Sequence, residues 1–217
     1  LISDRITGGR PLVGVRAPAA PLTQELLREL GRPVVAPSAN RFGHISPTVA
    51  AHVEEEFEGK VAGLDGGPCR VGLESTIIKV EKARLVLMRP GQLPRERIEE
   101  VAGLPLDDPA IPLTEGVPGA LKSHYAPRQP VRLRSAEELR QANAEAAALL
   151  VYSDGPWPGA RALLRLSSEA DLYARELYGA LRRAEASGCD EILVEAPPDT
   201  PGWLAVQDRL RRASSEK

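Results

Sequence analysis

The sequence is poor in lysine, cysteine and aromatic residues, and each shortage excludes a class of protein. Lysine is so scarce that arginine supplies most of the 28 basic residues, and the net charge of −2 gives no overall field to attract nucleic acid or a membrane. Cys69 and Cys189 fit no metal-ligand spacing and indicate reduced thiols. No stretch approaches the about 20 apolar residues that cross a bilayer. We therefore expect a globular, cytoplasmic protein with no membrane partner.

Several catalytic motifs are also missing. The sequence contains no GxxxxGK[ST] phosphate loop, no GxGxxG dinucleotide fingerprint and no HExxH or Cys/His metal cluster. It has no GxSxG nucleophile elbow, which argues against a hydrolase triad. P-loop enzymes, metalloproteases and α/β-hydrolases are therefore disfavoured, and we assign no metal site and no catalytic nucleophile.

The apolar periodicity predicts an α/β protein of two parts joined by a linker. Proline and glycine are concentrated in residues 103–130, which we interpret as the linker between a domain at 1–102 and one at 131–217. The expected helices cover residues 21–31, 46–57, 93–103, 136–148, 167–188 and 202–215. The expected strands cover residues 33–36, 61–67, 74–81, 84–91, 148–153 and 190–196. Alternating strands and helices after residue 130 predict a small parallel sheet covered by helices.

A loop rich in hydroxyl and amide side chains follows the apolar run Pro33–Ala36, in the stretch "PVVAPSANRFGHISPT". Ser38 and Asn40 lie two residues apart, so in an extended segment both side chains point the same way. Ser46 or Thr48 is expected to cap the start of a helix, whose free N–H groups favour an anion such as phosphate. The alternative is a strand-to-helix turn that only caps itself.

Further polar residues follow other expected strands. Arg16 closes the apolar run in "VGVRAP" and Arg89 ends "LVLMR", while Ser75 and Thr76 precede a β-branched strand. Guanidinium groups at strand ends are either solvated or bind anions, and ligands favour strand ends in α/β sheets. We expect Arg16, Ser38, Ser75 and Arg89 to surround one hollow that holds an anionic ligand.

The linker contains "GALKSHYAP", where His124 and Tyr125 stand beside a lysine and a serine. Tyr125 is able to stack on a base and His124 to bind phosphate, so this segment could fold over the site as a lid. The alternative is a solvated spacer with a chance aromatic residue. At the C-terminus, Arg209 and its neighbours in "DRLRRAS" are interpreted as solvated charges that complement the helix dipole.

In combination, "VGVRAP", "PVVAPSAN", "SPT", "LDGGPCRVGLESTII", "LMRPG", "PGALKSHYAP" and "QDRLRRAS" resemble the YrdC-like threonylcarbamoyl-AMP synthase family in its long form. The resemblance implies a twisted-sheet α/β domain, present here in part, followed by a small Rossmann-like α/β domain. It implies a nucleotidyltransferase that makes threonylcarbamoyl-AMP and pyrophosphate from L-threonine, bicarbonate and ATP with Mg²⁺. The product would pass to a tRNA threonylcarbamoyl-transferase complex, and direct tRNA binding is the weaker expectation.

The resemblance also implies roles for individual residues. An ATP site would include Ser38, Asn40, Ser46, Arg89, His124 and Tyr125. A threonine site would include Arg16, Ser75 and Thr76.

The family's Lys-x-Arg motif has no counterpart before Arg16, because the first lysine is Lys60. We therefore expect residues 1–217 to lack an N-terminal part of the synthase and to be inactive alone. The alternatives are an RNA- or nucleotide-binding module, or a carbamoyl-transfer domain without this activity.

Overall fold

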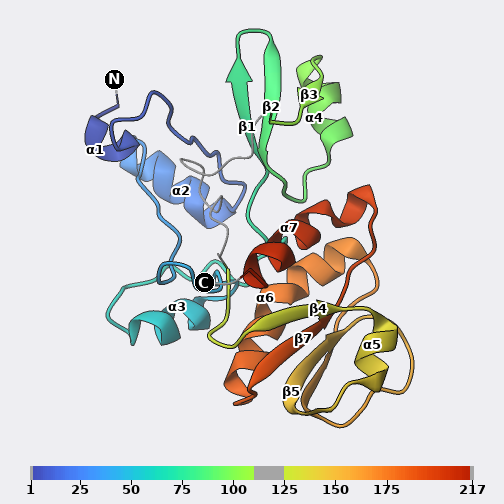
Figure 1. The fold of residues 1–217 in the computed structure, drawn as a ribbon. Coiled ribbons are helices and arrows are strands. Elements are labelled where there is room, and N and C mark those ends of the chain that lie inside the picture. Colours follow the sequence, from blue (N-terminus) through green and yellow to red (C-terminus); the bar gives the residue numbers. More distant parts are fainter. Residues whose placement is uncertain (1, 110–124, 216–217) are drawn as a thin grey trace.

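The computed structural model describes residues 2–109 and 125–215 and confirms an α/β protein (Figure 1). Its C-terminal part is a four-stranded, all-parallel sheet with the strand order β4-β7-β5-β6. The strands are β4 (Val131–Arg134), β5 (Ala144–Val151), β6 (Ala160–Arg165) and β7 (Glu191–Glu195). The helices are α5 (Ala136–Gln141), α6 (Ala170–Ala186) and α7 (Leu204–Ala213), with a 3-10 turn, η1, at Pro201–Trp203. This is the small Rossmann-like layer that the sequence predicts.

Helices cover both faces of this sheet, so its central strands are buried on both sides. Along β5, Leu150 packs with α6 and α7, whereas its neighbours Leu149 and Val151 pack on the opposite face with Leu139 of α5. These three β5 side chains are all 0% exposed. In Figure 1, α6 and α7 lie on one side of the sheet and α5 on the other.

One expected helix in this domain was wrong in its second half. The helix predicted for 136–148 ends at Gln141, and Ala144–Val151 forms the central strand β5. Alanine favours helices, but the side chains of Ala147 and Ala148 are buried between the sheet and the helices that cover its two faces. This tertiary burial outweighs the helix propensity of alanine. Strands β4 and β6 were not predicted, because one is short and the other carries two exposed arginines.

A second, smaller sheet lies in the middle of the chain. Strands β1 (Ile77–Glu81) and β2 (Arg84–Arg89) form the predicted antiparallel hairpin. The predicted helix is α4 (Arg95–Ala102), which ends at Gly103 with φ 65°. A short strand, β3 (Leu106–Asp107), pairs in parallel with β2, so the start of the expected linker belongs to this sheet. The boundaries at residues 102 and 130 stay a prediction.

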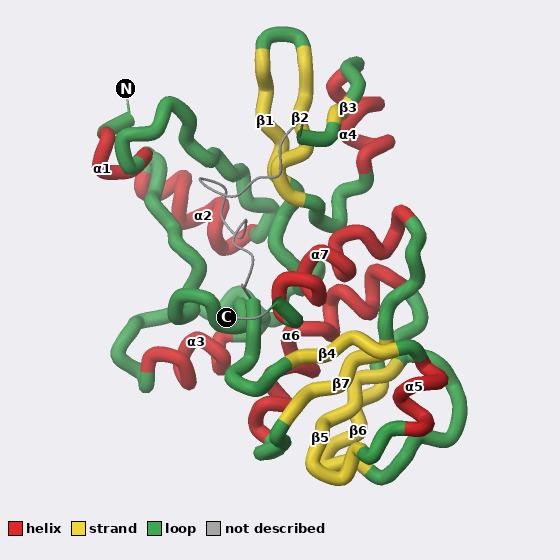
Figure 2. Tube along the Cα trace, in the orientation of Figure 1, coloured by secondary structure: helices red, strands yellow, loops and turns green. Residues whose placement is uncertain are grey.

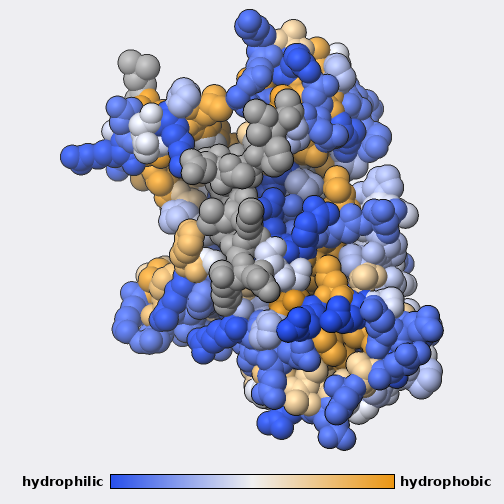
Figure 3. Space-filling view, viewed as in Figure 1, coloured by the Kyte–Doolittle hydropathy of each residue, from blue (hydrophilic) through white to orange (hydrophobic). Residues whose placement is uncertain are grey.

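Residues 2–76 contain three helices joined by long irregular segments (Figure 2). The helices are α1 (Asp4–Thr7), α2 (Pro21–Leu30) and α3 (Ala50–Phe57). The strands expected at 33–36 and 61–67 are absent, because no described strand pairs with them. Val34 and Val35 are consequently 50% and 67% exposed. Hydrophobic surface is visible on this part of the molecule in Figure 3.

The start of α3 also differs from expectation. Its N-cap is Val49, without a side-chain capping bond, so neither Ser46 nor Thr48 caps it. Instead, the backbone N–H of Thr48 donates to Nδ1 of His52 at 3.2 Å. Among the helices of the described ranges, none combines the length and apolarity needed to span a bilayer.

Candidate functional site

A buried polar cluster joins the loops of the N-terminal part to α6 and α7. We call it the polar junction; its members are Ser46, Glu74, Arg89, Tyr125, Tyr178 and Arg209. Ser46 follows the loop after residue 36, Glu74 precedes β1, and Arg89 ends β2. Tyr178 and Arg209 come from α6 and α7, 104 and 135 residues after Glu74 in the chain. The junction therefore depends on contacts that are distant in sequence.

Glu74 is the centre of this junction. Its Oε1 accepts a hydrogen bond from Ser46 Oγ at 2.5 Å, and its Oε2 accepts from Tyr178 OH at 2.9 Å and Arg209 Nε at 2.8 Å. Burial opposes the charge of this carboxylate, but the guanidinium of Arg209 and the hydroxyl of Ser46 outweigh it. The pKa of Glu74 is therefore lower than its ordinary value. Glu74 is thus a charged, fully engaged structural acid.

Arg209 balances this buried negative charge. Its side chain is 0% exposed, its Nη2 donates to the carbonyl of Glu74 at 3.2 Å, and its Nη1 donates to Asp208 at 2.6 Å. Its Cζ also lies 5.4 Å from the ring centroid of Tyr125. Burial alone would lower the pKa of Arg209, but the neighbouring tyrosines and Glu74 raise it above its ordinary value. The interpretation of Arg209 as a solvated charge was therefore wrong.

Arg89 and Tyr125 form the side of the junction nearest the small sheet. Arg89 is 7% exposed and donates through Nε and Nη2 to the carbonyl of Ser75 at 3.2 and 3.0 Å, and through Nη1 to Tyr125 OH at 3.4 Å. Burial lowers the pKa of Arg89. Tyr125 stacks on Tyr178 with a centroid distance of 5.8 Å and has an unusual φ of 60°. A non-glycine residue with this φ is strained and persists because its surroundings hold it.

Asn40 lies in the loop that leads to Ser46. Its Nδ2 donates to the carbonyls of Arg41 and His44 at 3.0 and 3.1 Å, which fixes the loop locally. Its Oδ1 is buried and accepts no hydrogen bond from the described residues. Such an atom is costly unless it acquires a partner, so Asn40 presents a free acceptor.

A second contact with α6 holds the same loop. The carboxylate of Glu56 accepts from the backbone N–H of Arg41 at 3.0 Å and lies 3.2 Å from Nδ1 of His44. Arg182 of α6 lies 3.6 Å from Glu56 and donates to the carbonyl of Ile45 at 2.5 Å. The Ile45 end of this segment is therefore held directly by α6, and the Arg41 end is held by Glu56 of α3, which Arg182 contacts.

The structure gathers some of the predicted site residues and not others. Ser46, Arg89, Tyr125 and the backbone of Ser75 meet at the junction, and the hydroxyl of Thr76 donates to the carbonyl of Leu93 at 3.2 Å. Arg16 and Ser38 are exposed and join no member of the junction in the described part of the chain. His124 lies outside the described residues.

Arg16, Ser38, Ser75 and Arg89 line neither of the two hollows defined by the described residues, and the expectation that they share one hollow stays a prediction. The physical reason is that the strands expected to carry Arg16 and Ser38 have no partner strand, so both side chains face solvent. Arg89 instead turns inward to Ser75 and Tyr125.

Sequence reasoning missed Glu74, Tyr178 and Arg209 as members of the site. The burial of Arg209 could have been predicted from helical periodicity. Arg209 lies on the face of α7 that also buries Val206 and Ala213. No local pattern identifies Glu74 and Tyr178, whose hydrogen bond spans 104 residues. The described residues also contain no group of three His, Cys, Asp or Glu side chains that could hold a metal ion.

Two family profiles match the chain nearly end to end. Residues 1–91 match the Sua5/YciO/YrdC profile, described as "Telomere recombination", and residues 93–215 match the profile of the threonylcarbamoyl-AMP synthase C-terminal domain. The chain belongs to the threonylcarbamoyl-AMP synthase family. This agrees with the resemblance inferred from the sequence motifs.

Curated relatives and solved structures agree with this membership. Threonylcarbamoyl-AMP synthase of Pyrococcus abyssi is 38% identical over 96% of this chain and 66% of its own length, and that of Bacillus subtilis is 34% identical over 98% and 66%. A crystal structure of P. abyssi Sua5 complexed with L-threonine superposes with a TM-score of 0.83 at 35% identity, covering 98% of this chain and 67% of that one. The chain thus spans about two thirds of the length of these curated family members.

Proposed function

We propose that the protein makes threonylcarbamoyl-AMP and pyrophosphate from L-threonine, bicarbonate and ATP. The observation that carries this proposal is the family membership, supported by two synthase relatives that match nearly all of the chain. We further propose that the protein acts in the cytoplasm and that its product passes to a tRNA threonylcarbamoyl-transferase complex.

In this proposal the residues of the Asn40–Ser46 loop and the junction form one wall of the ATP site, with Ser38, Arg89, His124 and Tyr125. The unsatisfied Oδ1 of Asn40 supports a ligand contact there, because it would accept from a donor of the nucleotide. Arg89 would hold phosphate oxygens, and Arg16 would pair with the threonine carboxylate near Ser75 and Thr76.

The reaction needs no covalent enzyme intermediate. The amine of threonine attacks bicarbonate, water leaves, and a carbamate forms. A carbamate oxygen then attacks the α-phosphorus of ATP as the bond to the β-phosphate oxygen breaks, which releases pyrophosphate. Positioning and charge neutralisation account for most of such a transfer, and the fixed loop and the buried guanidinium of Arg89 would contribute to both.

The described residues do not form a Mg²⁺ cage. The carboxylate of Glu74 is already engaged by Ser46, Tyr178 and Arg209, and no cluster of three ligating side chains occurs in the described ranges. Mg²⁺ would therefore arrive with the phosphates of ATP and keep water ligands, and no step is assigned to it.

The test is pyrophosphate release by the full-length protein, measured with ATP, threonine and bicarbonate together and with each omitted. We expect turnover only when all three are present. Turnover that does not depend on threonine would contradict the proposal. Losing a charge-assisted contact costs about 1.5–3 kcal/mol, so Arg16→Gln should chiefly raise the KM for threonine by about tenfold or more.

Residues 1–217 by themselves should be inactive. Arg16 and Ser38 do not reach the junction in this chain, so the proposed threonine and ATP contacts are not assembled. The same assay on purified residues 1–217 checks this expectation, and robust turnover would refute it.

A further inference from the structure

Two side chains of the C-terminal domain hold one oxygen of a carboxylate, and the other oxygen holds a residue of the proposed ATP site. Tyr178 OH and Arg209 Nε donate to Oε2 of Glu74 at 2.9 and 2.8 Å. Oε1 of Glu74 accepts from Ser46 Oγ at 2.5 Å. No contact with ATP or threonine is assigned to Tyr178 or Arg209, so Glu74 lies between them and the proposed ligand contact.

The direction of the Ser46 hydroxyl depends on this carboxylate. A serine hydroxyl has one hydrogen, and in Ser46 it is donated to Glu74, so the lone pairs of Oγ point away from Oε1. A carboxylate is planar, so a displacement of Oε2 also turns Oε1. Tyr178 and Arg209 hold Oε2 and therefore help to set where the acceptor side of the hydroxyl points.

Arg209 has a second route to the proposed ATP site, through the backbone. Its Nη2 donates to the carbonyl of Glu74 at 3.2 Å. The carbonyl of the next residue, Ser75, accepts from Nε and Nη2 of Arg89 at 3.2 and 3.0 Å. Two guanidiniums thus bind successive carbonyls, and the position of Arg89 depends on a segment that Arg209 fixes. Arg89 is the residue proposed to hold phosphate oxygens.

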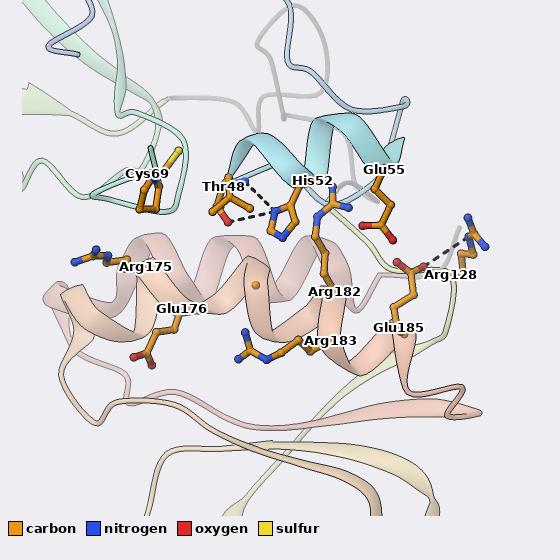
Figure 4. Close-up of a pocket in the computed structure, with 14 residues that line it drawn as sticks. Thr48, His52, Glu55, Cys69, Arg128, Arg175, Glu176, Arg182, Arg183 and Glu185 are labelled. Atoms are coloured by element: carbon orange, nitrogen blue, oxygen red, sulfur yellow. Dashed lines mark hydrogen bonds and ion pairs between the residues drawn. The ribbon is translucent and has the colours of Figure 1, made fainter. Parts of the chain in front are cut away.

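Other contacts attach the same segments to α6 without the hydroxyl of Tyr178. Leu73, the residue before the carboxylate, is 8% exposed and packs in the core cluster around α6 and α7. Figure 4 shows Arg182 extending from α6 toward α3, and its Nη2 donates to the carbonyl of Ile45, next to Ser46, at 2.5 Å. Removing the Tyr178 hydroxyl should therefore leave the two parts docked and change only how side chains at the junction are oriented.

We propose that Tyr178 and Arg209 are positioning residues of the synthase, which act on ATP binding through Glu74. Tyr178 acts on Ser46, and Arg209 acts on both Ser46 and Arg89. This inference rests on the proposed function and adds a role for the C-terminal domain that requires no contact with substrate. The affinity for ATP should consequently respond to both residues more than the affinity for threonine.

The test is the Kd of ATP, measured by isothermal titration calorimetry, together with steady-state pyrophosphate release, both on the full-length protein. Tyr178→Phe removes only the hydroxyl and keeps the ring that stacks on Tyr125. We expect the Kd and the KM for ATP to rise about fivefold. The KM for threonine should change by less than about twofold, because the hydroxyl of Thr76 is held separately by the carbonyl of Leu93.

The matched control is Tyr173→Phe on the same helix. Tyr173 is 0% exposed, and its hydroxyl has no hydrogen-bond partner in the described ranges. The substitution therefore removes the same group from the same helix without a described contact with Glu74. It should leave the Kd and the KM for ATP within about twofold of those of the unchanged protein.

Further variants test the route. If Tyr178 acts through Ser46, then Tyr178→Phe should change the Kd of ATP by less than about twofold in the Ser46→Ala protein. Arg209→Lys keeps the charge but not the fork of donors, so it should weaken ATP binding less than Arg209→Gln does. Part of the Arg209→Lys effect should remain in the Ser46→Ala protein, because Arg209 also acts on Arg89.

Equal ATP affinity in Tyr178→Phe and Tyr173→Phe would overturn the proposal. So would an undiminished effect of Tyr178→Phe in the Ser46→Ala protein, equal factors for ATP and threonine, or no ATP binding by the unchanged protein. If the unchanged protein binds ATP but releases no pyrophosphate with threonine and bicarbonate, the proposed synthesis fails, and the calorimetric comparison still decides this inference.

Discussion

Residues 33–36 and residues 148–151 are both short apolar runs, yet the first is exposed and irregular and the second is a buried strand. Val34 and Val35 are 50% and 67% exposed and pair with no described strand, whereas Leu149 and Leu150 are 0% exposed at the centre of a parallel sheet. The difference lies in the neighbours and not in the residues. An apolar run becomes a strand where partner strands and covering helices are present.

The same contrast extends to the two parts of the chain. Within residues 2–76, the residues buried as a whole are Ile45, Ser46, Gly72 and Leu73, and the two large apolar ones, Ile45 and Leu73, belong to the core cluster built around α6 and α7. The N-terminal part therefore takes its order from the C-terminal domain, through that cluster and the polar junction. Substituting the buried charged residues of this interface is therefore the most direct test of whether the N-terminal part depends on the C-terminal domain.

The largest expected effect comes from Arg209→Met, which removes the fully buried cation that balances the partly buried carboxylate of Glu74. Breaking a buried ion pair costs about 3–5 kcal/mol, and urea unfolding measures the loss. Hydrogen exchange should increase at residues 41–46 and 72–76 more than in β5. Arg211→Met removes an exposed arginine from the same helix and should change the free energy of unfolding by less than about 0.5 kcal/mol. An equal decrease in the free energy of unfolding in the two variants would show that the ion pair of Arg209 and Glu74 does not stabilise the fold.

A pair of leucine truncations tests the contrast in burial directly. Leu150→Ala should cost about 2–5 kcal/mol of unfolding free energy, because it opens a cavity in a core covered on both faces. Leu64, by contrast, is 63% exposed, and Leu64→Ala should cost less than about 0.5 kcal/mol. A large cost at Leu64 would mean that this surface is covered in solution.

These contrasts explain which elements the sequence could predict. Helix α2 and the β1–β2 hairpin depend on local periodicity and turn residues, so their positions follow from the nearby sequence. The strands expected at 33–36 and 61–67 depend on partners elsewhere, which no local pattern reveals. Ala144–Ala148 show the reverse error, because helix propensity was outweighed by burial in the sheet.

The site was predictable to the same limited extent. Ser46, Arg89 and Tyr125 lie in recognisable sequence motifs, and all three belong to the polar junction. Their proposed contacts with ATP stay predictions. Glu74 and Arg209 were missed as partners because charged residues are usually solvated, and only the fold brings these two together across 135 residues. Tertiary contacts of this kind lie beyond single-sequence reasoning.

Gly72 offers a smaller and more local test of the dependence on α6. A Cβ added to Gly72 would lie 2.4 Å from the Cα of Arg175, and its φ is 84°. Gly67 has a similar φ of 79° with nothing within 4 Å of the added atom. Both alanine variants therefore share the backbone strain, and Gly72→Ala adds a clash with helix backbone worth about 1–3 kcal/mol more. Equal destabilisation, measured by thermal and urea unfolding, would mean that α6 moves away without cost.

The smallest expected effect concerns how helices begin in the two parts. Ser135 caps α5 through a complete capping box with Glu138, whereas α2 begins after Ala20 without a side-chain cap. Ser135→Ala should cost about 1 kcal/mol of unfolding free energy, and Ser135→Thr should retain most of it. Conversely, Ala20→Ser should stabilise α2 slightly, since the φ and ψ of Ala20, −67° and 122°, already suit an N-cap. If Ala20→Ser raises protection from hydrogen exchange in α2 without changing global unfolding, α2 opens independently of the C-terminal core. A matching rise in both would instead place α2 in one cooperative unit with α6 and α7.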